Sequence, residues 1–244
     1  MVKKILIGLG FFGGIVGLII IFLFIFPQNL YLLYFYSPFH SFDFSNTAAT
    51  PVRRKITKPP PNFSYKGMYS AGNLQFQSPW DITETFRKDE YIAYDAVGSK
   101  LITTYLSSEL NLFEVTRSKN DGTLEDLEKI AGHKITKNYD YYSFLLNRSI
   151  KQVHPFGDRN KNWAEATYVI VKAAIPLNKK VDRIDEIWHN GFRIFDIKGD
   201  LDLGLTDHHI FIFTESDEVY EFILLKTSAT QEEIDYLLYS LKSK

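Results

Sequence analysis

The sequence predicts an α+β domain, built as a mostly antiparallel sheet with helices packed on it, preceded by one N-terminal transmembrane helix. Three observations lead to this prediction. An apolar run without charged residues fills residues 5–26. Further along, short strand-like segments follow one another across two-residue turns, and helix-like segments open with capping-box sequences. Meandering strands interrupted by helices are typical of layered α+β domains.

The apolar run is long enough to cross a bilayer. As a helix, Ile5–Phe26 would extend about 33 Å at ~1.5 Å per residue, against a hydrocarbon core of ~30 Å. A cleaved signal peptide would have an apolar region of roughly 7–15 residues and would end in small residues. This run ends instead in F-I-F-P at residues 24–27. We therefore expect an uncleaved signal anchor that lies in membrane lipid.

The basic residues around the anchor predict its orientation. Lys3 and Lys4 lie in residues 1–4, and the next basic residues are Arg53-Arg54-Lys55. Positively charged flanks stay on the cytoplasmic side of a membrane. We expect a single-pass protein of the cell membrane with residues 1–4 in the cytoplasm. The C-terminal domain would then be extracytoplasmic, and periplasmic in a Gram-negative cell.

Glycines in the anchor form two overlapping G-x-x-x-G pairs, Gly10 with Gly14 and Gly13 with Gly17. Such pairs let two membrane helices approach closely, so they predict transmembrane packing that would produce a homodimer. The alternative, which we favour, is that glycine is simply common in membrane helices.

Residues 27–62 are predicted to connect the anchor to the domain. Tyrosines and phenylalanines are concentrated in residues 31–44, as in the aromatic belts at membrane interfaces. The segment V-R-R-K-I-T-K-P-P-P at residues 52–61 ends in three prolines and reads as an extended, stiff spacer. We expect its basic residues to be solvated, the alternative being contact with anionic headgroups. The soluble domain would cover residues 63–244.

The first part of this domain alternates strand and helix patterns. Two hairpins are expected around Ala71-Gly72 and Gly98-Ser99, and a further strand at residues 111–116. T-L-E-D at residues 123–126 resembles a capping box and would open a helix that stops near Gly132. A second helix is expected from Asn138 to about Ile150. A third helix is expected over residues 163–174. The alternative there is a strand, because the segment is rich in β-branched residues.

The last third of the chain has the clearest signals. Asn190-Gly191 between residues 186–189 and 192–198 is a strong two-residue hairpin turn. A second hairpin is expected around Ser216-Asp217. T-Q-E-E at residues 230–233 is a full capping box and opens a helix with one apolar stripe of Ile234, Leu237, Leu238 and Leu241.

Two stretches carry a resemblance to a known fold. They are N-L-Q-F-Q-S-P-W-D at Asn73–Asp81 and the ending D-E-V-Y-E-F-I-L-L-K-T…T-Q-E-E-I-D-Y-L-L-Y-S-L at Asp217–Leu241. Together with the order of elements, they resemble the α/β/α sandwich of the PsbP-like and Mog1-like proteins over about residues 63–244. This resemblance implies a binding or assembly role without a catalytic motif. The membrane anchor departs from the soluble members of the family.

Composition excludes several classes of function. The chain has 28 basic and 29 acidic residues, a formal net charge of −1, and no cysteine. A nucleic-acid partner, which would need a basic excess or a basic stripe, is not expected. Disulfides, thiol catalysis and cysteine-bound metals are excluded. No cofactor is expected, since no phosphate-binding glycine loop is present outside the apolar run.

The triplet Asp207-His208-His209 is the one candidate for a metal site. Within a strand, Asp207 and His209 would share one face and His208 would lie on the other. A pair of ligands needs at least one more from elsewhere. The alternative, which we favour, is a strand that begins with polar residues.

The segment at residues 154–163 is the most loop-like part of the domain. Loops carry binding residues more often than core elements do. It offers candidate partner contacts through His154, Phe156, Asp158, Arg159 and Trp163. The alternative is a plain connection between helices.

The sequence therefore predicts a single-pass, membrane-anchored, non-catalytic binding or assembly module of the cell envelope that contacts a protein partner. The alternative is a membrane-bound, metal-dependent hydrolase that uses Asp207 and His209. The discriminating feature is whether a third acidic or histidine side chain approaches these two in a pocket.

Overall fold

The computed structural model describes residues 48–88, 91–96, 99–106, 124–149, 165, 168–169, 172, 181–200 and 205–244. The larger sheet consists of β1 (Pro51–Arg54), β4 (Thr83–Lys88), β5 (Tyr91–Ala96), β6 (Ser99–Leu106), β7 (Arg183–His189), β8 (Phe192–Asp200), β9 (Thr206–Phe213) and β10 (Val219–Thr227). The smaller sheet consists of β2 (Gly67–Ala71), β3 (Leu74–Ser78) and β11 (Lys242–Ser243). The helices are α4 (Leu124–Ala131), α5 (Asn138–Leu146) and α7 (Gln231–Tyr239).

The strand order establishes the fold class. The larger sheet has eight strands in the order β1-β7-β8-β9-β10-β6-β5-β4, and the smaller has the order β11-β3-β2. Every strand pair is antiparallel except β1 with β7, which is parallel. The domain is therefore α+β with a mostly antiparallel sheet, as the sequence predicted.

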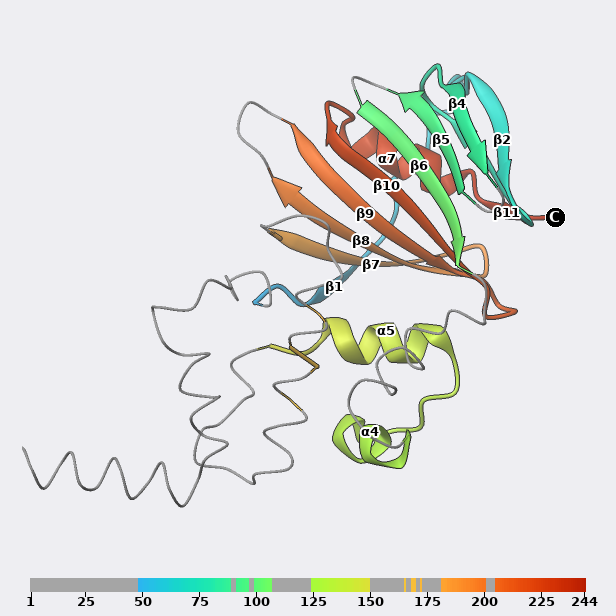
Figure 1. Ribbon diagram of the computed structural model, residues 1–244. Helices are drawn as coiled ribbons and strands as arrows, with labels where there is room; N and C mark the ends of the chain where they lie inside the picture. Colours follow the sequence, from blue (N-terminus) through green and yellow to red (C-terminus); the bar gives the residue numbers. More distant parts are fainter. Residues whose placement is uncertain are drawn as a thin grey trace, which may run out of the picture.

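Elements cover both faces of the larger sheet (Figure 1). One face packs against α7 and the smaller sheet, and Ile210 and Ile212 of β9 belong to that core. The other face packs against α5 and α4, and Phe211 and Phe213 belong to that second core. Because successive side chains of a strand point to opposite faces, β9 is buried on both sides. We call these two sides the α7 face and the α5 face.

The turn and cap signals read from the sequence are confirmed. Asn190 and Gly191 both have positive φ, 47° and 82°, as a tight hairpin turn requires. Gly132 ends α4 with φ 73°. Thr230 Oγ1 accepts a hydrogen bond from Glu233 N at 3.3 Å, and Glu233 Oε2 accepts one from Thr230 N at 2.8 Å, which completes the capping box of α7.

Other predictions of local structure have separate outcomes. The described residues between 163 and 174, which are 165, 168, 169 and 172, are helical, so the strand alternative is wrong there. The strand expected at residues 111–116 lies outside the described residues. β4 was missed because all six of its residues are exposed at the sheet edge, so no apolar alternation marks it.

The sequence placed residues 51–54 in a solvated spacer, and the structure corrects this. They form β1, which pairs with Ile184–Ile187 of β7. Local composition gives no sign of this pairing, because it joins segments about 130 residues apart. The folded part of the chain thus includes residues before Asn62.

In the part of the chain that the structure describes, no helix is long and apolar enough to cross a bilayer. The anchor expected at residues 5–26 lies outside that part and stays a prediction.

A buried ionic network fastens β1 to the rest of the domain. Asp185 of β7 is fully buried and accepts hydrogen bonds from Arg54 Nε at 2.6 Å and from Lys198 Nζ at 2.7 Å. The two terminal nitrogens of Arg54 bind both carboxylate oxygens of Asp235 in α7, at 2.8 and 2.7 Å. Asp235 also accepts the backbone N–H of Thr57 at 2.8 Å. A single guanidinium therefore joins β1, β7 and α7.

A second fully buried carboxylate, Asp196 of β8, extends this network. Its Oδ1 lies 2.8 Å from His208 Nδ1, and its Oδ2 lies 3.9 Å from Lys198 Nζ and 4.0 Å from Arg54 Nη2. Burial alone would raise the pKa of Asp196, but His208, Lys198 and Arg54 outweigh it and hold the pKa below its ordinary value. This carboxylate therefore stabilises the fold at neutral pH, and its contribution is lost as pH falls through its lowered pKa.

Replacing Arg54 with leucine removes the guanidinium that binds both oxygens of the buried Asp235, and it removes one of the cations that contact Asp185. We expect Arg54→Leu to lower the free energy of unfolding by about 3 kcal/mol, the cost of breaking a buried ion pair on one side. Chemical denaturation of the full chain in detergent measures this. Lys55→Gln, at the exposed neighbouring residue, is the matched control and should change stability little; equal losses in the two variants would contradict the role of the network.

Candidate functional site

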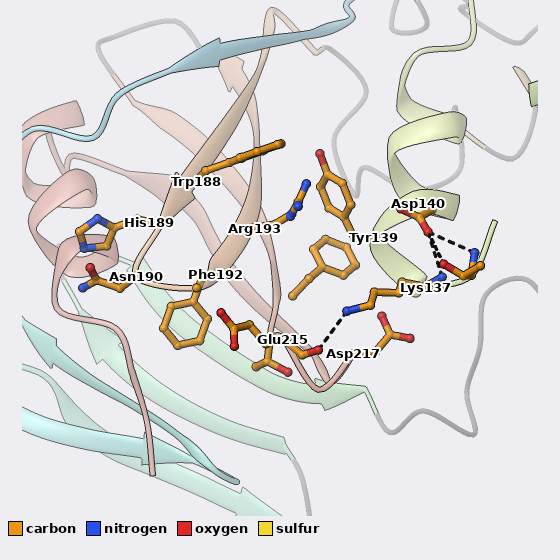
Figure 2. A pocket seen from close by; sticks show the side chains of 14 residues that line it. Lys137, Tyr139, Asp140, Trp188, His189, Asn190, Phe192, Arg193, Glu215 and Asp217 are labelled. Atoms are coloured by element: carbon orange, nitrogen blue, oxygen red, sulfur yellow. Dashed lines mark hydrogen bonds between the residues drawn. The ribbon is translucent and has the colours of Figure 1, made fainter. Parts of the chain in front are cut away.

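A groove of about 610 Å³ opens on the α5 face, where several strand ends meet (Figure 2). Three segments line it: residues 136–140 at the start of α5, residues 188–193 at the β7–β8 hairpin, and residues 213–217 at the end of β9 and the following turn. The groove is thus built from parts of the chain that the sheet brings together.

The β7–β8 hairpin positions the central side chains of the groove. A two-residue turn at Asn190-Gly191 fixes the register, so Trp188 lies directly opposite Arg193. Both side chains point to the α5 face. Trp188 keeps 44% of its surface exposed, which is unusual for so large an apolar side chain.

Cations and aromatic rings alternate along this part of the site. The guanidinium carbon of Arg193 lies 3.9 Å from the ring centroid of Trp188 and 4.7 Å from that of Tyr139. Arg53 of β1 lies 3.6 Å from the same Trp188 centroid. Tyr139 in turn stacks on Phe195, with centroids 5.4 Å apart and rings nearly parallel. We call Arg53, Trp188, Arg193, Tyr139 and Phe195 the cation–aromatic stack.

Glu186 holds in place the two rings that flank Arg193. Its Oε1 accepts a hydrogen bond from Trp188 Nε1 at 2.7 Å and another from the hydroxyl of Tyr139. Burial, together with this bond to Glu186, raises the pKa of Tyr139, so its hydroxyl stays protonated and remains a donor. The rings are thereby fixed before any partner arrives.

Hydrogen bonds to backbone groups fix the opposite wall. Asp217 accepts the backbone N–H of Asn138 at 2.8 and 3.1 Å, which satisfies a free donor at the start of α5. Asp140 accepts the backbone N–H groups of Thr136 and Lys137, both at 3.1 Å. These two carboxylates therefore have structural partners within the wall of the groove.

Asp207 and His209, the candidate metal pair, lie in β9 away from the groove lining. Asp207 accepts a hydrogen bond from the backbone N–H of Lys226, whereas His209 Nε2 contacts Glu221 Oε1. Their partners differ, and the described residues contain no group of three or more histidines and carboxylates placed to hold a metal ion. The third ligand that the pair would need is not supplied by this part of the chain.

His208, the remaining member of the triplet, lies on the opposite face of β9. Its Nδ1 contacts Asp196 there, as the strand alternation predicted. The three polar residues at the start of β9 therefore do not act together.

Two sets of predicted site residues lie outside the described residues and stay predictions. The candidate partner contacts are His154, Phe156, Asp158, Arg159 and Trp163. The glycines expected to pack the transmembrane helix are Gly10, Gly13, Gly14 and Gly17. The groove is lined by other residues, so it is a candidate site that the sequence did not predict.

The cation–aromatic stack was missed from the sequence, although part of its signal is present there. A two-residue turn at Asn190-Gly191 makes Trp188 and Arg193 cross-strand partners by simple counting. Arg53 and Tyr139 could not be found in this way, because β1 and α5 reach the hairpin only through long-range packing.

No model of a known protein family matches this chain, and no curated protein matches it.

A buried lysine lies away from the groove, between α5 and the segment before β1. Lys172 is 2% exposed, and its Nζ donates to Ala49 O at 2.5 Å and to Arg148 O at 2.6 Å. Burial lowers the pKa of Lys172 to about 7, and the charge of Arg148 acts in the same direction. The folded state thus binds this proton more weakly than the unfolded state does.

This difference predicts a pH dependence of stability. Between a pH of about 7 and the ordinary lysine pKa of 10.5, the unfolded chain binds more protons, so stability should rise with pH. From about pH 6 to about pH 9 we expect a rise on the order of 2 kcal/mol that Lys172→Met removes. Chemical denaturation at several pH values measures it, with the exposed Lys134→Met as control. An identical pH profile in wild type and Lys172→Met would contradict the burial of a charged amine.

Proposed function

We propose that the protein is a single-pass, membrane-anchored, non-catalytic binding or assembly module of the cell envelope that acts through contacts with another protein. The observation that carries this proposal is the cation–aromatic stack beside a groove, in which Arg53, Trp188 and Arg193 are exposed. Tryptophan, tyrosine and arginine are the residue types that dominate the energy of protein interfaces. Here Trp188 and Arg193 lie on the β7–β8 hairpin, and Tyr139 lies on α5.

The remaining polar groups of the groove support binding rather than chemistry. Asp140 and Asp217 accept backbone N–H groups, and His189 Nε2 contacts the backbone oxygen of Tyr239 at 3.1 Å. A general base must instead reach a substrate proton with a free lone pair. These groups serve the structure of the walls.

The layered arrangement supports the finer proposal of a PsbP-like or Mog1-like sandwich. The two resembling stretches fall on β3 and on β10 with α7, which lie together around the core of the α7 face. In that family's pattern, which implies binding and assembly roles, the closing helix follows the last strand, as α7 follows β10 here.

The predicted anchor would hold the groove close to the membrane. A domain tethered to the membrane meets other envelope proteins at a raised effective concentration, so modest affinity is sufficient. With residues 1–4 in the cytoplasm, the groove would act on the extracytoplasmic side.

Site-directed photo-crosslinking of the full chain in native membranes tests the proposal. A crosslinking amino acid at the exposed Glu215, in the groove lining, should give partner adducts that mass spectrometry identifies. The matched control is the exposed Glu232 in α7, on the opposite side of the sheet. Equal adducts from both sites, or none from Glu215, would contradict the groove as the contact surface.

A second variant sharpens this test. Trp188→Ala should lower the adduct yield from position 215, because truncating an interface hot spot costs about 2 kcal/mol or more. Met68→Ala removes another exposed apolar side chain, 67% exposed in β2, and should leave the yield unchanged.

A further inference from the structure

We infer that the groove recognises an extended acidic segment of the partner protein, in which two carboxylates two residues apart bind Arg53 and Arg193. This inference rests on the proposed function and specifies its ligand. It follows from the spacing of the two cations, the direction of their donors and the local charge.

The spacing is set by the order of the strands. β1 and β8 pair with opposite edges of β7, so Arg53 and Arg193 approach Trp188 from opposite sides. Their guanidinium carbons lie 3.6 and 3.9 Å from the indole centroid. The two guanidinium carbons are therefore at most about 7.5 Å apart, a separation that accommodates the ~6.6 Å between side chains i and i+2 on one face of an extended chain.

The stack also directs the hydrogen-bond donors of both arginines. Trp188 covers one face of each guanidinium, and Tyr139 covers the second face of Arg193. The in-plane N–H groups are then presented at the edge of the stack, in the geometry that binds a carboxylate through two hydrogen bonds. Within the described residues neither arginine has a carboxylate ion-pair partner.

Around Trp188, two arginines lie near one carboxylate, and this excess of cations favours an acidic ligand at this end of the groove. The nearest acid, Glu186, is bonded to Trp188 and Tyr139. Asp140 and Asp217 accept hydrogen bonds from backbone N–H groups. The side chain of Glu215 is exposed, and its backbone oxygen accepts a hydrogen bond from Lys137 Nζ at 3.1 Å. The acidic residues of the partner would thus lie across Trp188, with the neighbouring part of the partner in the groove.

A spacing scan on a peptide array tests this directly. The probes are extended alanine–serine peptides of about 12 residues that carry two glutamates at separations from one to five. The full-length protein, in nanodiscs of phosphatidylcholine, is applied and detected. We expect binding to peak at a separation of two, about five-fold above separations of one and three, because only then do both carboxylates reach the arginines from one face.

Variants link the peak to the two arginines. Arg53→Gln and Arg193→Gln should each abolish the preference for a separation of two, while Arg87→Gln, at an exposed arginine of the edge strand β4, should keep it. A structural defect would lower binding at every separation, whereas loss of one cation removes the preference itself. Equal binding at all separations, or a preference that survives in both variants, would overturn the inference.

Two other outcomes separate this inference from related ideas. Binding to vesicles that contain phosphatidylglycerol, dependent on Arg53 and Arg193 and unmatched by any peptide, would assign the arginines to lipid phosphates and overturn it. Partner adducts from position 215 without a spacing preference would overturn the acidic segment but leave the proposed function standing. A spacing preference without adducts in membranes would overturn the proposed function but leave the acidic segment standing.

Discussion

The buried contact of Arg54 with Asp185 and Asp235 is the constraint on which the rest of the structure depends. Burying charges is costly, so such a cluster is tolerated only when each group is paired and hydrogen-bonded in good geometry. Here one guanidinium binds both oxygens of Asp235 and one oxygen of Asp185. The correct position of β1 beside β7 is the arrangement that satisfies all three groups, so the network specifies where this strand lies.

β1 also connects the buried network to the surface of the domain. Because neighbouring residues of a strand point to opposite faces, the inward placement of Arg54 puts Arg53 on the α5 face, over Trp188. The buried ions on one side of the sheet thus position a cation of the cation–aromatic stack on the other side. β1 is also the first described strand after the predicted anchor, so the segment that leads from that anchor helps to build the proposed binding surface.

Local signals in the sequence predicted much of the fold and little of the site. Asn190-Gly191, Gly132 and the Thr230 capping box predicted turns and helix ends, because each rests on backbone conformations that few residues adopt. β1 was assigned to a spacer, since its pairing depends on partners far along the chain. The stack was missed for the same reason, although the hairpin alone makes Trp188 and Arg193 neighbours. Asp207 and His209 were a candidate metal pair because of their residue types, but their actual hydrogen-bond partners could not be predicted from the sequence.

Because the chain has no cysteine, a single introduced cysteine can test directly whether the ionic network holds β1 in place. A single cysteine at Ile56, which packs partly buried against the core beside β1, reports whether this segment stays in place. In the full-length protein the thiol should be alkylated slowly, and Arg54→Leu should accelerate its alkylation about ten-fold or more, because the strand is released when its buried contacts are lost. Equal alkylation rates with and without Arg54 would show that the ionic network does not hold β1, and would contradict the account.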